Sequence, residues 1–161
     1  MEQIKNKSAL NLIMLFSFFV LGCAYFIQYV LNHEPCNLCF VERIPYLLAI
    51  PLVILTVVLK KFEKIVLLLL TLLFIFGAIV SFYHLGIEQG FFNESLVCSL
   101  EKNDPNLSKE NLIKQLKQTT VSCKDVTFRF FGLSLATINI VISLVLSAIM
   151  YREIKNYGKN K

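Results

Sequence analysis

Two cysteines and an arginine stand close together between His33 and Arg43, in a stretch flanked by two long apolar runs. Cys36 and Cys39 form a Cys-x-x-Cys motif, whose sulfur atoms are close enough to form a small-ring disulfide. In such a motif the pKa of a thiol is commonly lowered and the bond exchanges easily. Arg43 follows Cys39 by four residues, so on a helix the two would share a face and the guanidinium would favour the thiolate. The stretch therefore predicts thiol–disulfide exchange.

The elements that must position this motif are those of a membrane protein. Hydrophobic residues make up 56% of the 161 residues, charged residues only 17%, and the mean hydropathy is +0.64. Such a chain places its apolar surface in lipid. Four runs are predicted to span the membrane, at about residues 9–31, 44–59, 65–83 and 130–151. We therefore expect an all-α fold, a four-transmembrane-helix bundle that forms a single integral membrane domain over residues 1–161.

The short second run indicates the depth of the cysteine pair. It has 16 uncharged residues, which cover about 24 Å of helix, whereas the hydrocarbon core is about 30 Å thick. To span the membrane, the helix must include Glu42 and Arg43 in its first turn. The Cys-x-x-Cys end is therefore expected at the membrane interface.

Basic residues are unevenly distributed between the two sides of this predicted bundle. The two ends of the chain and the loop at residues 60–64 hold nine of the 16 Lys and Arg residues but only three of the 11 acidic residues. Because Lys and Arg are enriched on the cytoplasmic side of membrane proteins, both termini are expected there. The net charge of +5 then needs no nucleic-acid partner.

This orientation places the loops at about residues 32–43 and 84–129 on the outer, oxidising side. Four of the five cysteines fall in these loops, and the fifth, Cys23, is expected to pack inside the first helix. Cysteines on an oxidising side indicate disulfides. The four are Cys36, Cys39, Cys98 and Cys123.

The second outer loop is predicted to contain a short amphipathic helix at residues 106–118. Cys98 precedes this helix and Cys123 follows it, so a disulfide between them would close the loop around it. By chain entropy such a closure contributes about 3.5 kcal/mol. A bond on a membrane surface would still be open to attack by another thiol.

The end of the third run carries two further candidate residues, His84 and Glu88, beside glycines and aromatic residues. This composition suits a helix end that lines a site. An ordinary interfacial histidine would also explain His84 when it is considered alone.

Three chemistries are open to the four outer cysteines. They could be structural disulfides, although a Cys-x-x-Cys ring is strained and reducible. They could bind zinc, but a structural zinc site usually has two such motifs and this chain has one, so we expect no metal. In the third reading, two exchangeable disulfides form a relay between a soluble thiol protein and a lipid-soluble quinone. The predicted depth of the pair at the membrane interface favours the relay.

The motif Cys36-Asn-Leu-Cys39-Phe-Val-Glu-Arg43 resembles the Cys-x-Leu-Cys-x-x-x-Arg signature of bacterial DsbB-type disulfide bond formation proteins. The resemblance covers nearly the whole chain and includes the stretches at residues 83–91 and 131–136. Aromatic residues that are common in the family after those stretches appear here as Phe92 and Ile138.

The resemblance implies an electron path through the four cysteines. A reduced DsbA-like thioredoxin-fold protein would attack a Cys98–Cys123 disulfide and form a mixed disulfide with Cys98. Cys123 would then exchange with Cys36 and release Cys39 as a thiolate. Cys39 would pass the electrons to ubiquinone or menaquinone, assisted by Arg43.

The same resemblance implies a multi-pass protein of the bacterial inner membrane with its active site on the periplasmic side. His84 and Glu88 would lie near the quinone. The alternative is a disulfide-stapled membrane scaffold or transporter subunit without redox turnover, which predicts unreactive disulfides and no quinone. A related oxidase that serves one dedicated partner is a closer rival, and the sequence does not separate it from a general oxidase.

Overall fold

The computed structural model describes residues 2–59, 63–93, 98, 122–124, 128–130 and 132–159. Most of these residues belong to four long helices, which are α1 (Glu2–Tyr29), α2 (Asn37–Leu59), α3 (Glu63–Glu88) and α6 (Leu135–Lys159). A small antiparallel hairpin of β1 (Arg129–Phe130) and β2 (Leu133–Ser134) precedes α6. The predicted helical bundle is thereby confirmed.

All four helices are long and apolar enough to cross a membrane. Many of their large apolar side chains point outward, among them Leu15 and Val58, each 69% exposed. A protein with such an apolar surface over four helices would not remain soluble in water, but lipid chains solvate that surface well. A helix pairs most of its backbone groups internally, as a bilayer requires, although Pro45 and Pro51 inside α2 have no N–H to donate.

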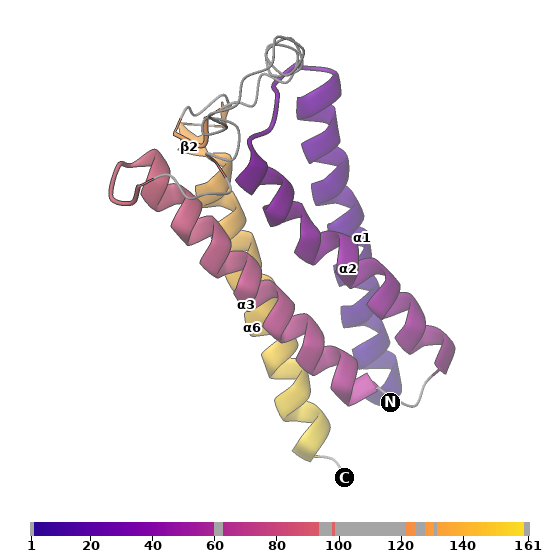
Figure 1. Cartoon of the computed structure of the whole chain (residues 1–161). Helices are drawn as coiled ribbons and strands as arrows, with labels where there is room; N and C mark the ends of the chain where they lie inside the picture. The colour runs from indigo at the N-terminus through magenta and orange to yellow at the C-terminus, as the bar shows by residue number, and fades with distance from the viewer. Residues whose placement is uncertain are drawn as a thin grey trace, which may run out of the picture.

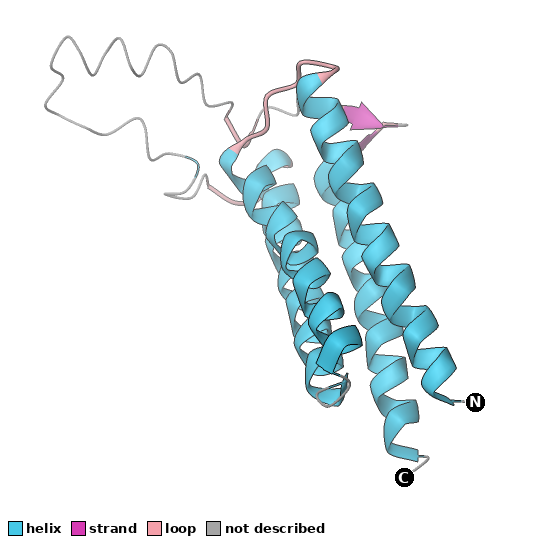
Figure 2. Cartoon of the chain, turned by 90° about the vertical axis from the view of Figure 1, so that its right-hand side faces the viewer, coloured by secondary structure: helices cyan, strands magenta, loops and turns pink. Residues whose placement is uncertain are grey.

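The two chain ends lie at one end of the bundle, and the hairpin and the first residues of α2 lie at the other (Figures 1 and 2). Helix α3 packs along α6, and α2 contacts both α1 and α3 (Figure 1). This arrangement brings the start of α2, the end of α3 and the start of α6 together at the end away from the termini.

Several helices extend beyond, or start apart from, the apolar runs in the sequence. Helix α2 begins at Asn37, before the apolar run at residue 44, so its first turns contain Cys39 together with Glu42 and Arg43, which were expected in its first turn. Helix α3 continues past residue 83 to Glu88. Helix α6 begins at Leu135 instead of residue 130, because the chain first turns through the hairpin.

The hairpin turn depends on Gly132, whose φ of 82° is rarely adopted by residues with a side chain. The predicted helix at residues 106–118 lies outside the described residues.

Helices α2, α3 and α6 approach one another closely at Gly77. A Cβ atom there would stand 3.1 Å from Cγ of Pro45 and 3.3 Å from the hydroxyl of Ser143. Beside this contact, the ring of Tyr46 packs on Phe74 with the ring centroids 5.7 Å apart. The glycine therefore lets α2 and α6 approach α3 closely, which brings polar residues of the three helices within reach of one another.

Helix α3 ends in a well-formed C-cap. The N–H of Gly90 bonds to the carbonyl of Ile87, and the N–H of Phe91 bonds to the carbonyl of Gly86, which is the Schellman pattern. Gly90 supplies the required positive φ of 79°. The ring of Phe92 then covers Gly86, where a Cβ would meet the ring at 2.1 Å. This cap fixes the last turns of α3, which carry two of the predicted site residues.

Candidate redox site

The Cys-x-x-Cys pair lies at the N-terminus of α2. Cys36 immediately precedes the helix and Cys39 lies in its first turn. Both are free thiols, with their sulfur atoms 2.7 Å apart. The backbone N–H of Cys39 donates a hydrogen bond to the sulfur of Cys36 at 3.3 Å. A helix N-terminus stabilises a thiolate at this position through its free N–H groups and its dipole.

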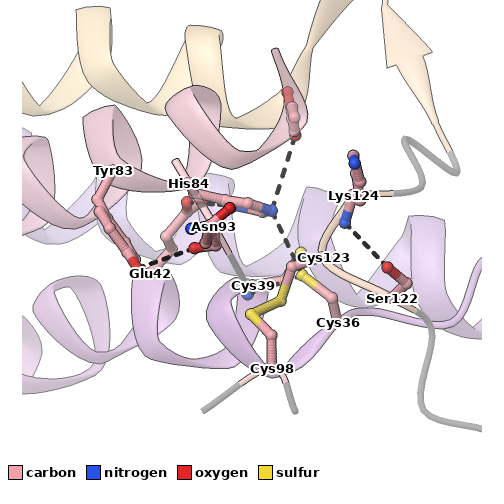
Figure 3. The surroundings of a disulfide bond; sticks show 11 residues. Cys36, Cys39, Glu42, Tyr83, His84, Asn93, Cys98, Ser122, Cys123 and Lys124 are labelled. Carbon is pink, nitrogen blue, oxygen red and sulfur yellow. Dashed lines mark hydrogen bonds and ion pairs between the residues drawn. A yellow bond between two sulfur atoms is a disulfide. The ribbon is translucent and has the colours of Figure 1, made fainter. Parts of the chain in front are cut away.

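The second cysteine pair packs against the first. Cys98 and Cys123 are joined by a disulfide, with their Cα atoms 5.9 Å apart. Cys123 is buried and belongs to one apolar cluster with Cys36 and Ile87. Figure 3 shows the disulfide beside Cys36. A thiol formed at Cys123 would therefore emerge beside the sulfur of Cys36.

His84 of α3 lies between Cys36 and an acidic residue of α2. Its Nε2 atom is 3.5 Å from the sulfur of Cys36, and its Nδ1 atom is 2.8 Å from Oε1 of Glu42 (Figure 3). The imidazole is buried, and so is the carboxylate of Glu42. Glu88, one turn along α3, places Oε1 3.7 Å from Nε2. The other oxygen of Glu88 has no hydrogen-bond partner among the residues that the structure describes.

A chain of hydrogen bonds continues from Glu42 into the helix bundle. Nδ2 of Asn139, in α6, donates to Oε2 of Glu42 at 3.3 Å and to the hydroxyl of Ser81 at 2.7 Å. The hydroxyl of Tyr46 donates to Oδ1 of Asn139. The carboxylate of Glu42 is thus held on both oxygens, by His84 from α3 and by Asn139 from α6.

Glu42 and Asn139 are site residues that sequence reasoning did not select. The signal that could have found them is their place inside spanning segments, where ionisable and amide side chains are costly unless they have partners. The sequence indicates Glu42 only as part of the first turn of a spanning helix. Nothing in the sequence pairs it with His84.

Arg43 is directed toward α1. Its Nη1 group donates to Oε1 of Gln28 at 2.7 Å. The guanidinium carbon also lies 5.2 Å from the ring centroids of Tyr25 and Phe40, within cation–π range. The role expected for Arg43 at the Cys39 thiolate or a quinone stays a prediction.

Cys36 is the acidic thiol of the pair. A hydrogen bond with the Cys39 thiol lowers the pKa of Cys36 to about 5, with a smaller contribution in the same direction from the ring of His84, while burial opposes the shift. At neutral pH the reduced protein therefore carries a thiolate at Cys36. A thiolate is the form that attacks a disulfide.

The donor atoms of Cys36, Cys39 and His84 all lie within 4.8 Å of one another. Two sulfurs on one tetrahedral zinc ion would stand roughly 3.8 Å apart, given Zn–S bonds of about 2.3 Å. The sulfur atoms here are 2.7 Å apart, which is too close for such an ion and close to the separation needed for a disulfide. The geometry therefore suits thiol chemistry better than zinc binding.

Comparison with known proteins agrees with this chemistry. The chain is 29% identical, over 140 residues, to the uncharacterized protein RP370 of Rickettsia prowazekii (strain Madrid E), a match that covers 85% of this chain and 81% of that protein. No solved structure matches the chain. The family model described as disulfide bond formation protein DsbB matches residues 6–151. The chain therefore belongs to the disulfide bond formation protein DsbB family.

Proposed function

We propose that this protein is a membrane thiol:quinone oxidoreductase of the bacterial inner membrane. It reoxidises a DsbA-like protein on the periplasmic side and passes the electrons to ubiquinone or menaquinone. The proposal extends the family's role in disulfide bond formation to a specific donor and acceptor.

The observation that carries the proposal is the different setting of the two sulfurs of the Cys-x-x-Cys pair. Cys36 is 5% exposed and packs with Cys123 of the loop disulfide. Cys39 is partly exposed and is followed along α2 by outward-facing Phe40 and Ile44. Cys39 also packs against the apolar cluster that contains Cys36, so the two cysteines differ in exposure, and the more exposed one lies in a helical segment with outward-facing apolar side chains. This difference suits a relay between water and lipid.

The electron path follows from this arrangement. A partner dithiol reduces the Cys98–Cys123 disulfide and becomes a disulfide itself. The Cys123 thiolate then attacks Cys36, so that a Cys123–Cys36 bond forms, the Cys36–Cys39 bond breaks and Cys39 leaves as a thiolate. Attack of the Cys98 thiolate on Cys123 restores the loop disulfide and leaves Cys36 and Cys39 reduced. The quinone is the final acceptor and takes up two electrons and two protons.

The apolar surface beside Cys39 fits a lipid-soluble quinone, because the side chains of Phe40 and Ile44 offer ring and aliphatic contacts at that position. Arg43, one turn after Cys39, is proposed to bind a quinone oxygen, since a guanidinium forms charge-assisted hydrogen bonds to such atoms. Glu88 is proposed to lie near the quinone, at the end of the electron path.

The test is quinone-dependent oxidation of a reduced DsbA-type protein by the purified protein in detergent. We expect the wild type to consume quinone, and Cys39→Ser and Cys98→Ser each to abolish turnover. Cys23→Ser is the matched control and should keep full activity, because Cys23 is an exposed free cysteine in α1.

The alternative of a stapled scaffold or transporter subunit predicts a different result. The wild type would leave the DsbA-type protein reduced, and its own cysteines would resist mild reductant. That outcome would refute the proposed function.

A further inference from the structure

We propose that His84, positioned by Glu42, is the acid–base group of this reaction, which holds the proton of Cys36 while the reduced pair carries a thiolate and gives it up when the Cys36–Cys39 pair is oxidised. This inference deepens the proposed function and rests on it. It assigns to two residues in the spanning helices a proton-transfer role that the electron path alone does not require.

The first support is the order of the contacts. The sulfur of Cys36, the imidazole of His84 and the carboxylate of Glu42 form one continuous line, with 3.5 Å between Sγ and Nε2 and 2.8 Å between Nδ1 and Oε1. A carboxylate that accepts from Nδ1–H leaves the lone pair of Nε2 directed at the thiol. This arrangement of nucleophile, base and orienting carboxylate is the one that activates thiols for attack.

The second support is the charge in the site. His84 is buried among groups that are negative or become negative: Glu42 from α2, Glu88 on its own helix, and Cys36 with Cys39 at the start of α2. From α6, the amide of Asn139 reaches Glu42 and brings no charge. A proton taken up by the imidazole would be stabilised by these anions, whereas the same ring in an apolar setting would resist a charge.

A purely structural role for the pair explains less. A His–Glu contact would tie α3 to α2 whichever way the outer nitrogen pointed. Here the outer nitrogen meets the sulfur of Cys36, and Glu42 is held on its second oxygen by Asn139. Buried ionisable groups inside a spanning helix are costly and commonly serve proton transfer.

The step balances as follows. The S–H bond of Cys36 breaks, the proton moves to Nε2 of His84, and the electron pair stays on sulfur. The Cys36–Cys39 bond then forms as two electrons leave the pair for the quinone. The proton held at Nε2 and the proton of Cys39 are the two that the quinone takes up on becoming a quinol. In the reverse direction, the imidazole takes up a proton again as Cys36 is released as a thiolate.

The experiment measures the pH profile of Cys36 alkylation by iodoacetamide in reduced protein without quinone or partner. The protein carries Ala at Cys23, Cys98 and Cys123, so that Cys36 and Cys39 are the remaining thiols, and mass spectrometry reports on the Cys36 peptide. We expect a midpoint near pH 5 in this parent. His84→Gln should raise the midpoint by about one pH unit or more, a roughly tenfold loss of rate on the acid side.

Glu42→Gln should shift the midpoint in the same direction by a smaller amount, because the imidazole keeps its place but loses its carboxylate. The matched histidine control is His33→Gln. His33 packs on the ring of Phe128, and this variant should keep the parental midpoint. A merely structural role for the pair would change stability but leave the midpoint where it was.

Each outcome decides the matter. If His84→Gln and Glu42→Gln both keep the parental profile, the inference is wrong. If only His84→Gln shifts the profile, the part assigned to Glu42 is wrong. Should His84→Gln fail to insert, Glu42→Gln alone decides by the same criterion. Wild-type quinone turnover is measured separately, so failure of the acid–base pair and failure of the oxidoreductase are distinguishable.

Discussion

At the scale of single residues, Cys36 and Cys39 have different surroundings although they belong to one motif. Cys36 faces a histidine and the loop disulfide, whereas Cys39 lies one turn before Arg43 and beside an apolar surface. Spacing alone assigns both thiols the same chemistry. Part of the difference arises from α3, which places His84 within hydrogen-bond distance of the Cys36 sulfur.

The acidity of Cys36 predicts how the stability of the reduced protein depends on pH. The pKa of Cys36 is about 5 in the folded protein and 9.0 for an unperturbed thiol. Between these values this thiol holds a proton in the unfolded chain but not in the folded protein, so the contribution of Cys36 to stability rises with pH by about 1.4 kcal/mol per pH unit. The contribution is complete above pH 9 and is lost as the pH falls through 5.

Thermal unfolding of reduced wild type and reduced Cys36→Ser across this range measures the difference. The oxidised protein is the matched control, because a cysteine in a disulfide does not titrate and the difference in slope should vanish. A reduced wild type whose stability relative to Cys36→Ser stays flat over this range would contradict the assignment of the thiolate to Cys36.

At the scale of elements, the helices are predictable and the contacts between them are not. Apolar runs reveal spanning segments because lipid imposes a minimum length. The same minimum length indicates that α2 starts early and includes Glu42 and Arg43, but it does not indicate the partners of these side chains on other helices. The hydrogen bond of Arg43 to Gln28 and the contact of Glu42 with His84 both depend on tertiary packing.

The candidate site divides along the same line. The four cysteines and His84 can be selected from the sequence because thiols and imidazoles commonly take part in redox and acid–base reactions. Asn139 is a common residue whose role depends on α6 facing Glu42, which no local pattern encodes. The pairing of His84 with Cys36 rather than Cys39 likewise depends on the position of α3 against α2.

The tight crossing at Gly77 yields a prediction at this scale. Gly77→Leu should destabilise the protein by about 1–3 kcal/mol, because the side chain would force Pro45 and Ser143 away from α3. Thermal unfolding in detergent measures the loss. Gly22→Leu in α1 is the matched control, since a Cβ at Gly22 meets nothing within 4 Å. Equal stability of the two variants would show that the crossing tolerates more space than the structure gives it.

At the scale of the whole molecule, the two chain ends and the cysteine site lie at opposite ends of the bundle (Figures 1 and 2). Disulfides persist in oxidising compartments and are rare in the cytosol. A Cys98–Cys123 disulfide is therefore expected on the outer side of the membrane, with both termini inside. The distribution of Lys and Arg, nine of 16 on the terminal side, points the same way by an independent argument.

The resulting prediction concerns reporters fused to this chain in a bacterial host. A fluorescent protein that matures only in the cytoplasm should fluoresce when fused after Lys161, and alkaline phosphatase, which needs periplasmic disulfides, should be inactive there. The matched fusion inserts each reporter within residues 106–118 of the second outer loop, where the two results should be exchanged. Active phosphatase after Lys161 would reverse the orientation. It would place the Cys98–Cys123 disulfide on the reducing, cytoplasmic side. A relay there could not take electrons from a periplasmic partner.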